Sequence, residues 1–237
     1  MVVSDFSSNW NPTSPKKAIK DDALNRAIFA KNIATLIKNY RSEESLVVGI
    51  YGSWGSGKST VLNFVIEEVK NAEGAIISRF NPWNVSDQNQ LISSFFKFFS
   101  DLLNRDDASG SLKNAANLAE GLSIISAPAA FFGMGFVSKA FENGAKMFRE
   151  ISDDLANFEY IKNEISRMLS ESGKRFIIVM DDIDRLNVFE IRQIFQLVKS
   201  MADFSNVVYV LAFEQGRMVT LARKCTPSGN EKLHPQA

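Results

Sequence analysis

The apolar residues of this chain gather in short continuous runs instead of alternating with polar ones. Four such runs, each bounded by turn residues, lie at 46–51, 75–80, 176–180 and 207–213, and Ser78 and Arg79 interrupt the second. Between them, apolar residues recur at the spacing of helices that bury one face. Apolar strands separated by helices are typical of a parallel sheet covered on both faces. The pattern therefore predicts an α/β fold.

The helices are predicted from their caps and their apolar spacing. Asp21 or Asp22 can cap a first helix, and Asn187 with Glu190 forms a capping-box pair before a later one. The face of the first helix that is predicted to be buried contains Leu24, Ala27, Ile28, Leu36, Ile37 and Tyr40. Two further helices are predicted over 91–102 and 154–170.

A glycine-rich segment connects the first predicted strand to the next helix. It reads G-x-x-x-x-G-K-S over Gly52–Ser59. Glycine permits a tight loop whose amide groups turn inward, and a helix N-terminus behind the loop favours anions. In this motif Lys58 reaches the outer phosphates of a nucleotide, the Ser59 hydroxyl ligates Mg²⁺, and Thr60 adds a contact nearer the α-phosphate. The candidate binding residues are Gly52, Ser53, Trp54, Gly55, Ser56, Gly57, Lys58, Ser59 and Thr60.

Two carboxylates follow the third predicted strand, at the sheet edge where ligands bind in such folds. Asp181 is expected to hold the magnesium ion, directly or through water, together with Ser59. Asp182 is placed to orient or deprotonate an attacking water molecule. For both residues the alternative is an aspartate that caps a helix or faces solvent after a core strand.

Two further polar residues are candidates for roles near the γ-phosphate. Glu214, just past the last predicted strand, fits a polar sensor, or else it caps the next helix. Arg185 can stabilise charge in a transition state or be recognised by a partner subunit through direct contact. Local pairing of Arg185 with Asp184 is the alternative.

Composition narrows the classes of protein. The 237 residues are 45% hydrophobic, enough for a large core, and Lys+Arg and Asp+Glu both number 27. The sequence has no long basic run that could bind the phosphate backbone of a nucleic acid. The single cysteine, Cys225, forbids an internal disulfide and fits a reducing, cytoplasmic compartment, and the single histidine, His234, argues against a Ser-His-Asp site. The first residues do not have the pattern of a signal peptide.

Four stretches together resemble the KAP family of P-loop NTPases, relatives of the STAND and AAA-type ATPases. They are GIYGSWGSGKST, RFNPWNVSDQNQLISSFF, IIVMDDIDR and NVVYVLAFE, and the match runs from about Asp21 to Glu214. The more specific marks are Trp54, the N-P-W after the second strand and the D-D-x-D-R at 181–185. The resemblance implies a three-layer sandwich with a mostly parallel sheet. In it, strand 207–213 lies between strand 46–51, which precedes the phosphate loop, and strand 176–180, which precedes Asp181 and is called the Walker B strand. It also implies regulatory work, because bacterial members are often linked to phage exclusion or defence and animal members are membrane-associated scaffolds.

The domain organisation follows from these motifs. We expect an irregular arm over 1–20, a P-loop NTPase domain over 21–220 with a helical insertion at about 105–150, and a polar tail over 221–237. A core of the KAP type normally has a further strand beside the first one, which the tail does not provide. Either this edge of the sheet is left open or the chain is a truncated or split product, and we expect the second. The expected protein partners are a second copy of the chain or a protein that supplies the C-terminal region.

The segment 121–138 carries no charge over 18 residues, which raises the question of a membrane. A single crossing would separate Lys58 from Asp181, so only zero or two crossings agree with the fold. Pro128, Gly133 and Gly135 would break the segment into halves too short to span. We expect a helical insertion buried against the domain or a partner. Peripheral membrane contact and a spanning hairpin stay as alternatives.

The motifs favour an ATPase that cleaves the β–γ bond of ATP with Mg²⁺. The N-K-x-D pattern of guanine-specific proteins is absent, so adenine is the expected base, and the helix around Arg26 and Phe29 is a candidate for part of its pocket. One competing class is a nucleotide-dependent switch that oligomerises or signals with little hydrolysis. Another is a small-molecule kinase, which would need an acceptor pocket and a basic lid that the sequence does not suggest.

Overall fold

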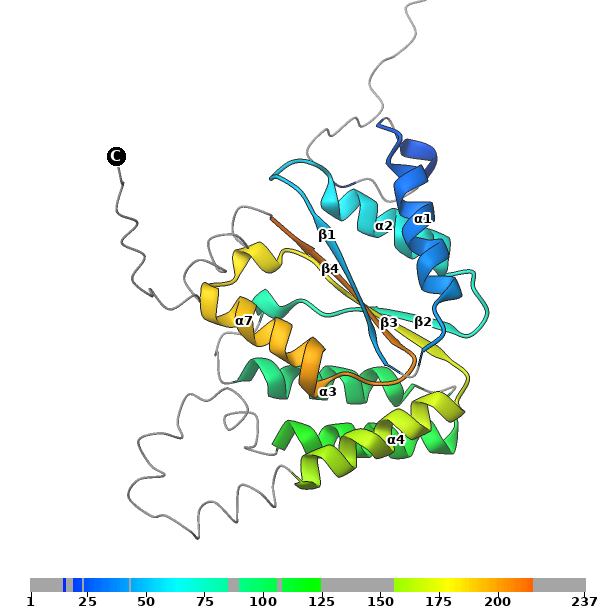
Figure 1. Ribbon diagram of the computed structural model, residues 1–237, viewed down its shortest axis with the longest axis vertical. Helices are drawn as coiled ribbons and strands as arrows, with labels where there is room; N and C mark the ends of the chain where they lie inside the picture. Colours follow the sequence, from blue (N-terminus) through cyan, green and yellow to red (C-terminus); the bar gives the residue numbers. More distant parts are fainter. Residues whose placement is uncertain are drawn as a thin grey trace, which may run out of the picture.

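The computed structural model describes residues 15, 19–22, 24–42, 44–84, 90–105, 108–124 and 156–214. In these ranges, parallel strands form one sheet with helices on both faces (Figure 1), which confirms the predicted α/β sandwich. The strands are β1 (Leu46–Tyr51), β2 (Ala75–Arg79), β3 (Arg175–Met180) and β4 (Val207–Phe213). The helices are α1 (Arg26–Asn39), α2 (Lys58–Val69), α3 (Leu91–Leu103), α4 (Gly110–Ile124), a helix at 156–171 and α7 (Val188–Gln196).

The strand order is β1-β4-β3-β2. Tyr51 at the end of β1 pairs with Phe213 of β4, and Leu211 of β4 pairs with Met180 of β3. The last of the described strands, β4, thus lies between the strand before the glycine-rich loop and the strand before the paired aspartates, as predicted. Because parallel strands end at the same edge of a sheet, the loops after β1, β3 and β4 meet there.

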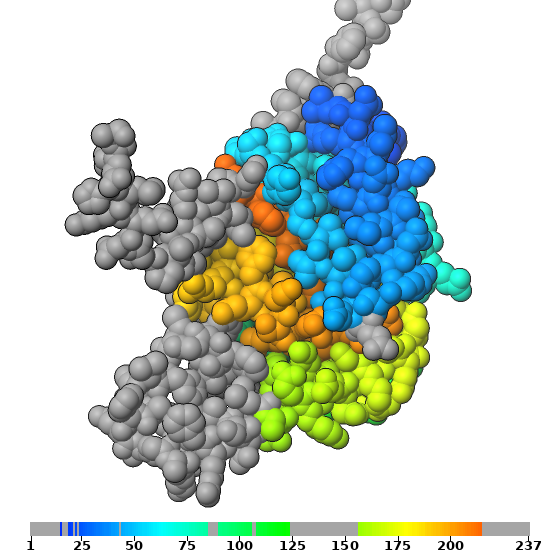
Figure 2. Space-filling view, in the orientation of Figure 1, coloured from blue at the N-terminus to red at the C-terminus, as the bar shows by residue number. Residues whose placement is uncertain are grey.

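Helices α1 and α2 cover one face of the sheet and lie side by side at the surface (Figure 2, blue and cyan). The buried side chains of α1 are Ala30, Ile33, Ala34 and Ile37. The predicted face was wrong for Leu24, Ile28 and Leu36, which are 68%, 69% and 50% exposed. The large apolar residues suggested one face, but the buried face of α1 also includes two alanines, which allow close approach to α2.

The other face of the sheet packs against an aromatic core, built largely from α3. Its phenylalanines 95, 96 and 99 are fully buried. The Phe99 ring stacks on Phe204 with centroids 5.1 Å apart. Tyr209 of β4 donates its hydroxyl hydrogen to the Ala202 carbonyl at 2.6 Å, and burial raises the pKa of Tyr209 well above its usual value. This face therefore combines apolar packing with a satisfied polar group.

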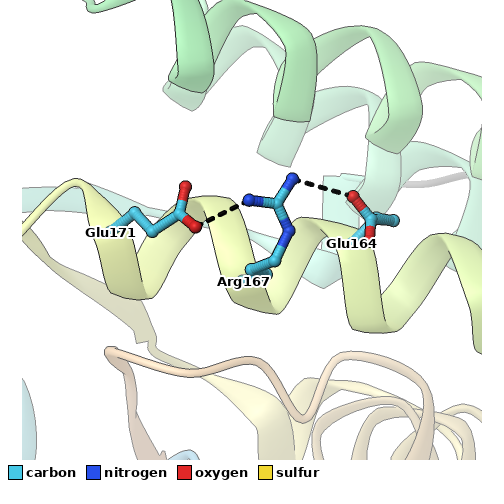
Figure 3. A network of polar contacts seen from close by, with 3 residues as sticks. All are labelled: Glu164, Arg167 and Glu171. Carbon is cyan, nitrogen blue, oxygen red and sulfur yellow. Dashed lines mark hydrogen bonds and ion pairs between the residues drawn. The ribbon is translucent and has the colours of Figure 1, made fainter.

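The helix at 156–171, predicted over 154–170, carries a charged network on its exposed side (Figure 3). Arg167 bonds Glu164 at 3.0 Å and Glu171 at 2.6 Å, one turn away in each direction. These hydrogen bonds raise the pKa of the Arg167 guanidinium. Pairs at these spacings stabilise the helix that carries them.

Helix α7 begins with the predicted capping box. The Asn187 side chain accepts hydrogen bonds from the backbone of Phe189 and Glu190 at 2.9 and 3.0 Å, and Glu190 accepts from the Asn187 backbone at 2.8 Å. The helix continues into a single π-turn, η5 (Leu197–Met201). Its start is thus fixed directly after the loop that carries the paired aspartates.

Several predictions concern residues outside the described ranges. They include most of the arm at 1–20, the tail at 221–237 and the larger part of the insertion, so the domain boundaries stay predictions. The uncharged segment begins within α4, and its residues 125–138 also lie outside the described ranges. None of the described helices is both long and apolar enough for a membrane crossing.

Candidate functional site

The loop between β1 and α2 turns at two glycines in the left-handed region. The backbone angle φ is 78° at Gly55 and 90° at Gly57, values that other residues adopt only with strain. Helix α2 begins immediately afterwards at Lys58, and Gly57 at its cap makes no side-chain hydrogen bond. Because glycine has no side chain that could cap the helix, the backbone N–H groups of Lys58 and Ser59 at its start can bind an anion.

Lys58 lies back over the start of this loop. Its ammonium group donates to the carbonyl oxygens of Gly52 and Ser53 at 3.2 and 3.3 Å. The Gly52 backbone N–H in turn donates to the Phe213 carbonyl at the end of β4, at 3.3 Å. Glu214 follows Phe213 directly, so it lies at the same edge of the sheet as the loop.

The paired aspartates follow β3 in an unusual backbone conformation. Asp182 has a φ of 56°, and its backbone N–H donates to the Asp181 carboxylate at 2.9 Å. Desolvation raises the pKa of Asp182, and the neighbouring Asp181 charge raises it further, whereas Arg185 and Lys58 act in the opposite direction. The net shift is upward, so Asp182 holds a proton more readily than an ordinary aspartate.

Arg185 connects the aspartate loop to the end of β2. Its guanidinium pairs with Asp182 at 2.9 Å and lies over the Trp83 ring, 5.4 Å from the centroid. Trp83 belongs to the short turn η2 (Pro82–Asn84) after β2. The local partner of Arg185 is thus Asp182, while the sequence suggested Asp184. Asp182 directly precedes the short turn η4 (Ile183–Arg185), so the paired side chains lie three residues apart.

The loop and the aspartates line one cavity of about 650 Å³, a size typical of small-molecule sites. Its lining consists of Pro15, Arg26, Trp54, Gly55, Gly57, Lys58, Ser59, Thr60, Asn63, Arg79, Asp181, Asp182, Asp184 and Arg185. Of the predicted site residues in the described ranges, Gly52, Ser53, Ser56 and Glu214 do not line it. Trp54 is 71% exposed at the rim, whereas Thr60 is buried.

The donors in the cavity fit a magnesium ion that is shared with phosphate. Ser59, in the first turn of α2, and Asp181, after β3, supply a hydroxyl and a carboxylate, and oxygen ligands are the ones that Mg²⁺ prefers. Within the described ranges, no group of three or more His, Cys, Asp or Glu side chains is placed to hold a metal. A magnesium ion here would take its other ligands from phosphate oxygens and water.

Two basic side chains of the cavity were missed as site residues by the sequence reasoning. Arg26 was considered only for an adenine pocket, together with Phe29, which is 53% exposed and does not line the cavity. Arg79, the last residue of β2, donates to the Asn63 side chain at 2.5 Å. The position of Arg79 at the end of a strand was a usable signal. The placement of Asn63 depends on how α2 is oriented, which the sequence pattern does not reveal.

The strand, the loop turned by glycines, the uncapped helix start and the aspartate after β3 together define a P-loop nucleotide-binding domain. The family model described as "KAP family P-loop domain" matches residues 26–234, so the chain belongs to the KAP family of P-loop NTPases. This confirms the resemblance seen in the sequence, and membership implies nucleotide binding. The chain is also 27% identical over 231 residues to the phage T7 exclusion protein of Escherichia coli (strain K12). That match covers 87% of this chain and 31% of the relative.

Proposed function

We propose that this domain binds ATP with Mg²⁺ and hydrolyses the bond between the β- and γ-phosphates. The supporting observation is that Lys58, Ser59, Asp181 and Asp182 line the same cavity. The loop amides and Lys58 hold the phosphate oxygens, and Ser59 with Asp181 would hold the metal ion. Adenine is the proposed base because the sequence lacks the N-K-x-D pattern.

In this proposal Asp182 is the general base. Its raised pKa, caused first by desolvation, makes the carboxylate a better proton acceptor. The proton of an attacking water passes to Asp182, the water oxygen bonds to the γ-phosphorus, and ADP leaves with the electrons of the broken β–γ bond. Mg²⁺, when bound, would neutralise part of the negative charge of the phosphates. Lys58 and the loop amides stabilise the charge that spreads over the phosphate oxygens.

Phosphate release by the purified protein tests this proposal. We expect Mg²⁺-dependent turnover that falls about 100-fold or more in Lys58→Ala and in Asp182→Asn. Asp182→Asn should still bind ATP, because only the base is lost. Lys31→Ala removes an exposed cation of α1 outside the cavity and should behave as the unsubstituted protein does. Equal turnover in the Lys58→Ala variant would contradict the proposed site.

The ion pair of Asp182 favours a second candidate, a nucleotide-dependent switch. One carboxylate oxygen of Asp182 is held by Arg185 at 2.9 Å, which restrains the group that would accept the proton. In a switch, bound ATP orders the domain or drives oligomerisation, and hydrolysis is slow. Light scattering of Asp182→Asn with ATP separates the two candidates. An ATP-dependent assembly that persists in the variant supports the switch, and one that depends on turnover supports the ATPase.

For the biological role we propose regulatory or defence work of the phage-exclusion kind. The support is the family and the name of the relative in Escherichia coli (strain K12), the phage T7 exclusion protein. A bacterial strain expressing this chain should then show a lower plating efficiency for at least one phage of a panel than a strain expressing Lys58→Ala. Identical plating of all phages on both strains would contradict this role.

A further inference from the structure

Arg26 lies outside the phosphate-loop motif, yet its guanidinium group packs against the loop. A Cβ atom built on Gly57 would lie 1.6 Å from Nη1 and 2.7 Å from Cζ of Arg26. Both residues line the cavity. The absence of a side chain at Gly57 therefore gives the guanidinium its place beside the loop.

The Nε atom of Arg26 is buried and has no hydrogen-bond partner within the described part of the protein. A buried donor without a partner costs free energy, so such groups usually have a ligand or water to satisfy them. The guanidinium is a planar fork of donors that matches the oxygens of phosphate. Its place against a loop that binds anions makes phosphate the fitting acceptor.

We propose that Arg26 is a phosphate-binding residue of this site, which donates from its guanidinium to a phosphate oxygen of the nucleotide held by the loop. The proposal rests on the proposed nucleotide binding and adds a second cation to Lys58. Lys58 lies at the Gly52 end of the loop and Arg26 at the Gly57 end, so the two cations contact different parts of it.

Helix α1 holds Arg26 in this position from both ends. At its start, the Asp22 carboxylate accepts the Ala27 backbone N–H at 2.8 Å. At its end, the Arg175 guanidinium donates to the Tyr40 carbonyl at 2.7 Å, which ties α1 to the start of β3. Arg26 is the first residue of α1, so its backbone is fixed relative to the sheet. A preorganised donor loses little entropy when it binds a ligand.

Calorimetric binding of ATP to the unsubstituted protein, Arg26→Ala, Arg26→Lys and Lys31→Ala tests the proposal. We expect the Kd for ATP to rise about 10- to 100-fold in Arg26→Ala, as for a lost charge-assisted hydrogen bond. Arg26→Lys keeps the charge without the fork and should fall between. Lys31→Ala, on the exposed side of the same helix, should leave the Kd unchanged.

Inorganic tripolyphosphate separates a phosphate contact from a base contact or a structural effect. It should raise the melting temperatures of the unsubstituted protein and of Lys31→Ala by similar amounts. The rise should be smaller for Arg26→Ala. The melting temperatures without ligand show whether each variant folds. If Arg26→Ala does not fold, Arg26→Lys takes its place in the comparison. Loss of ATP binding with an undiminished response to tripolyphosphate would overturn the proposal, and so would unchanged or tighter ATP binding in both Arg26 variants. If the unsubstituted protein binds no ATP, the proposed function itself fails.

Discussion

Asp182 combines a left-handed backbone with a desolvated carboxylate next to Asp181. Because desolvation raises its folded-state pKa, the folded protein binds a proton more tightly there than the unfolded chain does. The resulting stabilisation is fully present below the unfolded pKa and is lost as the pH rises through the folded pKa. At neutral pH the charged Asp182 therefore destabilises the fold, a cost often found at functional residues.

We predict that Asp182→Asn raises the free energy of unfolding at pH 7 while it abolishes turnover. Asparagine tolerates the left-handed backbone, and the partly exposed pair with Arg185 that it weakens is worth at most about 1 kcal/mol. The gain should shrink as the pH falls and disappear below the ordinary aspartate pKa, where both residues are neutral. Urea unfolding across this pH range measures the effect. A variant that is less stable at pH 7 would refute this account of Asp182.

Gly57 is required both by its backbone and by its neighbour. An alanine there would adopt a φ of 90°, and its methyl group would overlap Arg26. We predict that Gly57→Ala lowers the free energy of unfolding by roughly 1–2 kcal/mol and displaces Arg26 from the loop. Gly121→Ala is the control, since Gly121 lies within α4 with open space around it and should gain roughly 0.5–1 kcal/mol in denaturant unfolding. Equal effects of the two substitutions would contradict the conformational role of Gly57.

At the scale of elements, the start of α7 depends on its capping box. Asn187→Ala removes the acceptor for two backbone N–H groups, and we predict a loss of about 1 kcal/mol in the free energy of unfolding. Arg192→Ala, exposed on the same helix, is the control and should change stability by less than about 0.5 kcal/mol. Urea midpoints compare the two, and a silent Asn187→Ala would show that the cap does not stabilise α7.

Elements with strong local signals could be predicted from the sequence, and those that depend on packing could not. The four apolar runs gave strand bounds correct to within one residue, and the capping box at Asn187 was found from its spacing. The buried face of α1 was found only in part, with Ile37, because close packing on α2 also uses Ala30 and Ala34 and leaves the larger Ile28 exposed. Which face of a helix is buried is decided by tertiary packing and not by the number of large apolar residues on that face.

The site was predictable to the same degree. The motif at Gly52–Ser59 and the aspartates after β3 were found because each adjoins a strand end, where the fold gathers ligand-binding groups. Arg26 was predicted only as part of an adenine pocket, because its contact with Gly57 depends on how α1 packs on α2. No spacing of residues in the sequence indicates this contact, because it forms only when the two helices pack together.

At the scale of the whole molecule, the strand order places β4 between the two strands that carry the motifs. On the other side of β1, the described residues provide no further strand, and Tyr51 is 64% exposed. This is where the KAP resemblance leads one to expect another strand. The chain spans 31% of the length of the phage T7 exclusion protein, so the activity of that whole protein is not assigned to this domain.

The most direct test of the account is ATP binding by the purified protein with and without Mg²⁺, measured by isothermal titration calorimetry beside Lys58→Ala. The account predicts saturable binding that Mg²⁺ strengthens and that Lys58→Ala weakens by about 100-fold, because a cation facing the phosphates is lost. Arg41→Ala, an exposed cation outside the cavity, should bind as the unsubstituted protein does. An absence of binding in the unsubstituted protein, or equal binding in Lys58→Ala, would contradict the assignment of this cavity as a nucleotide site.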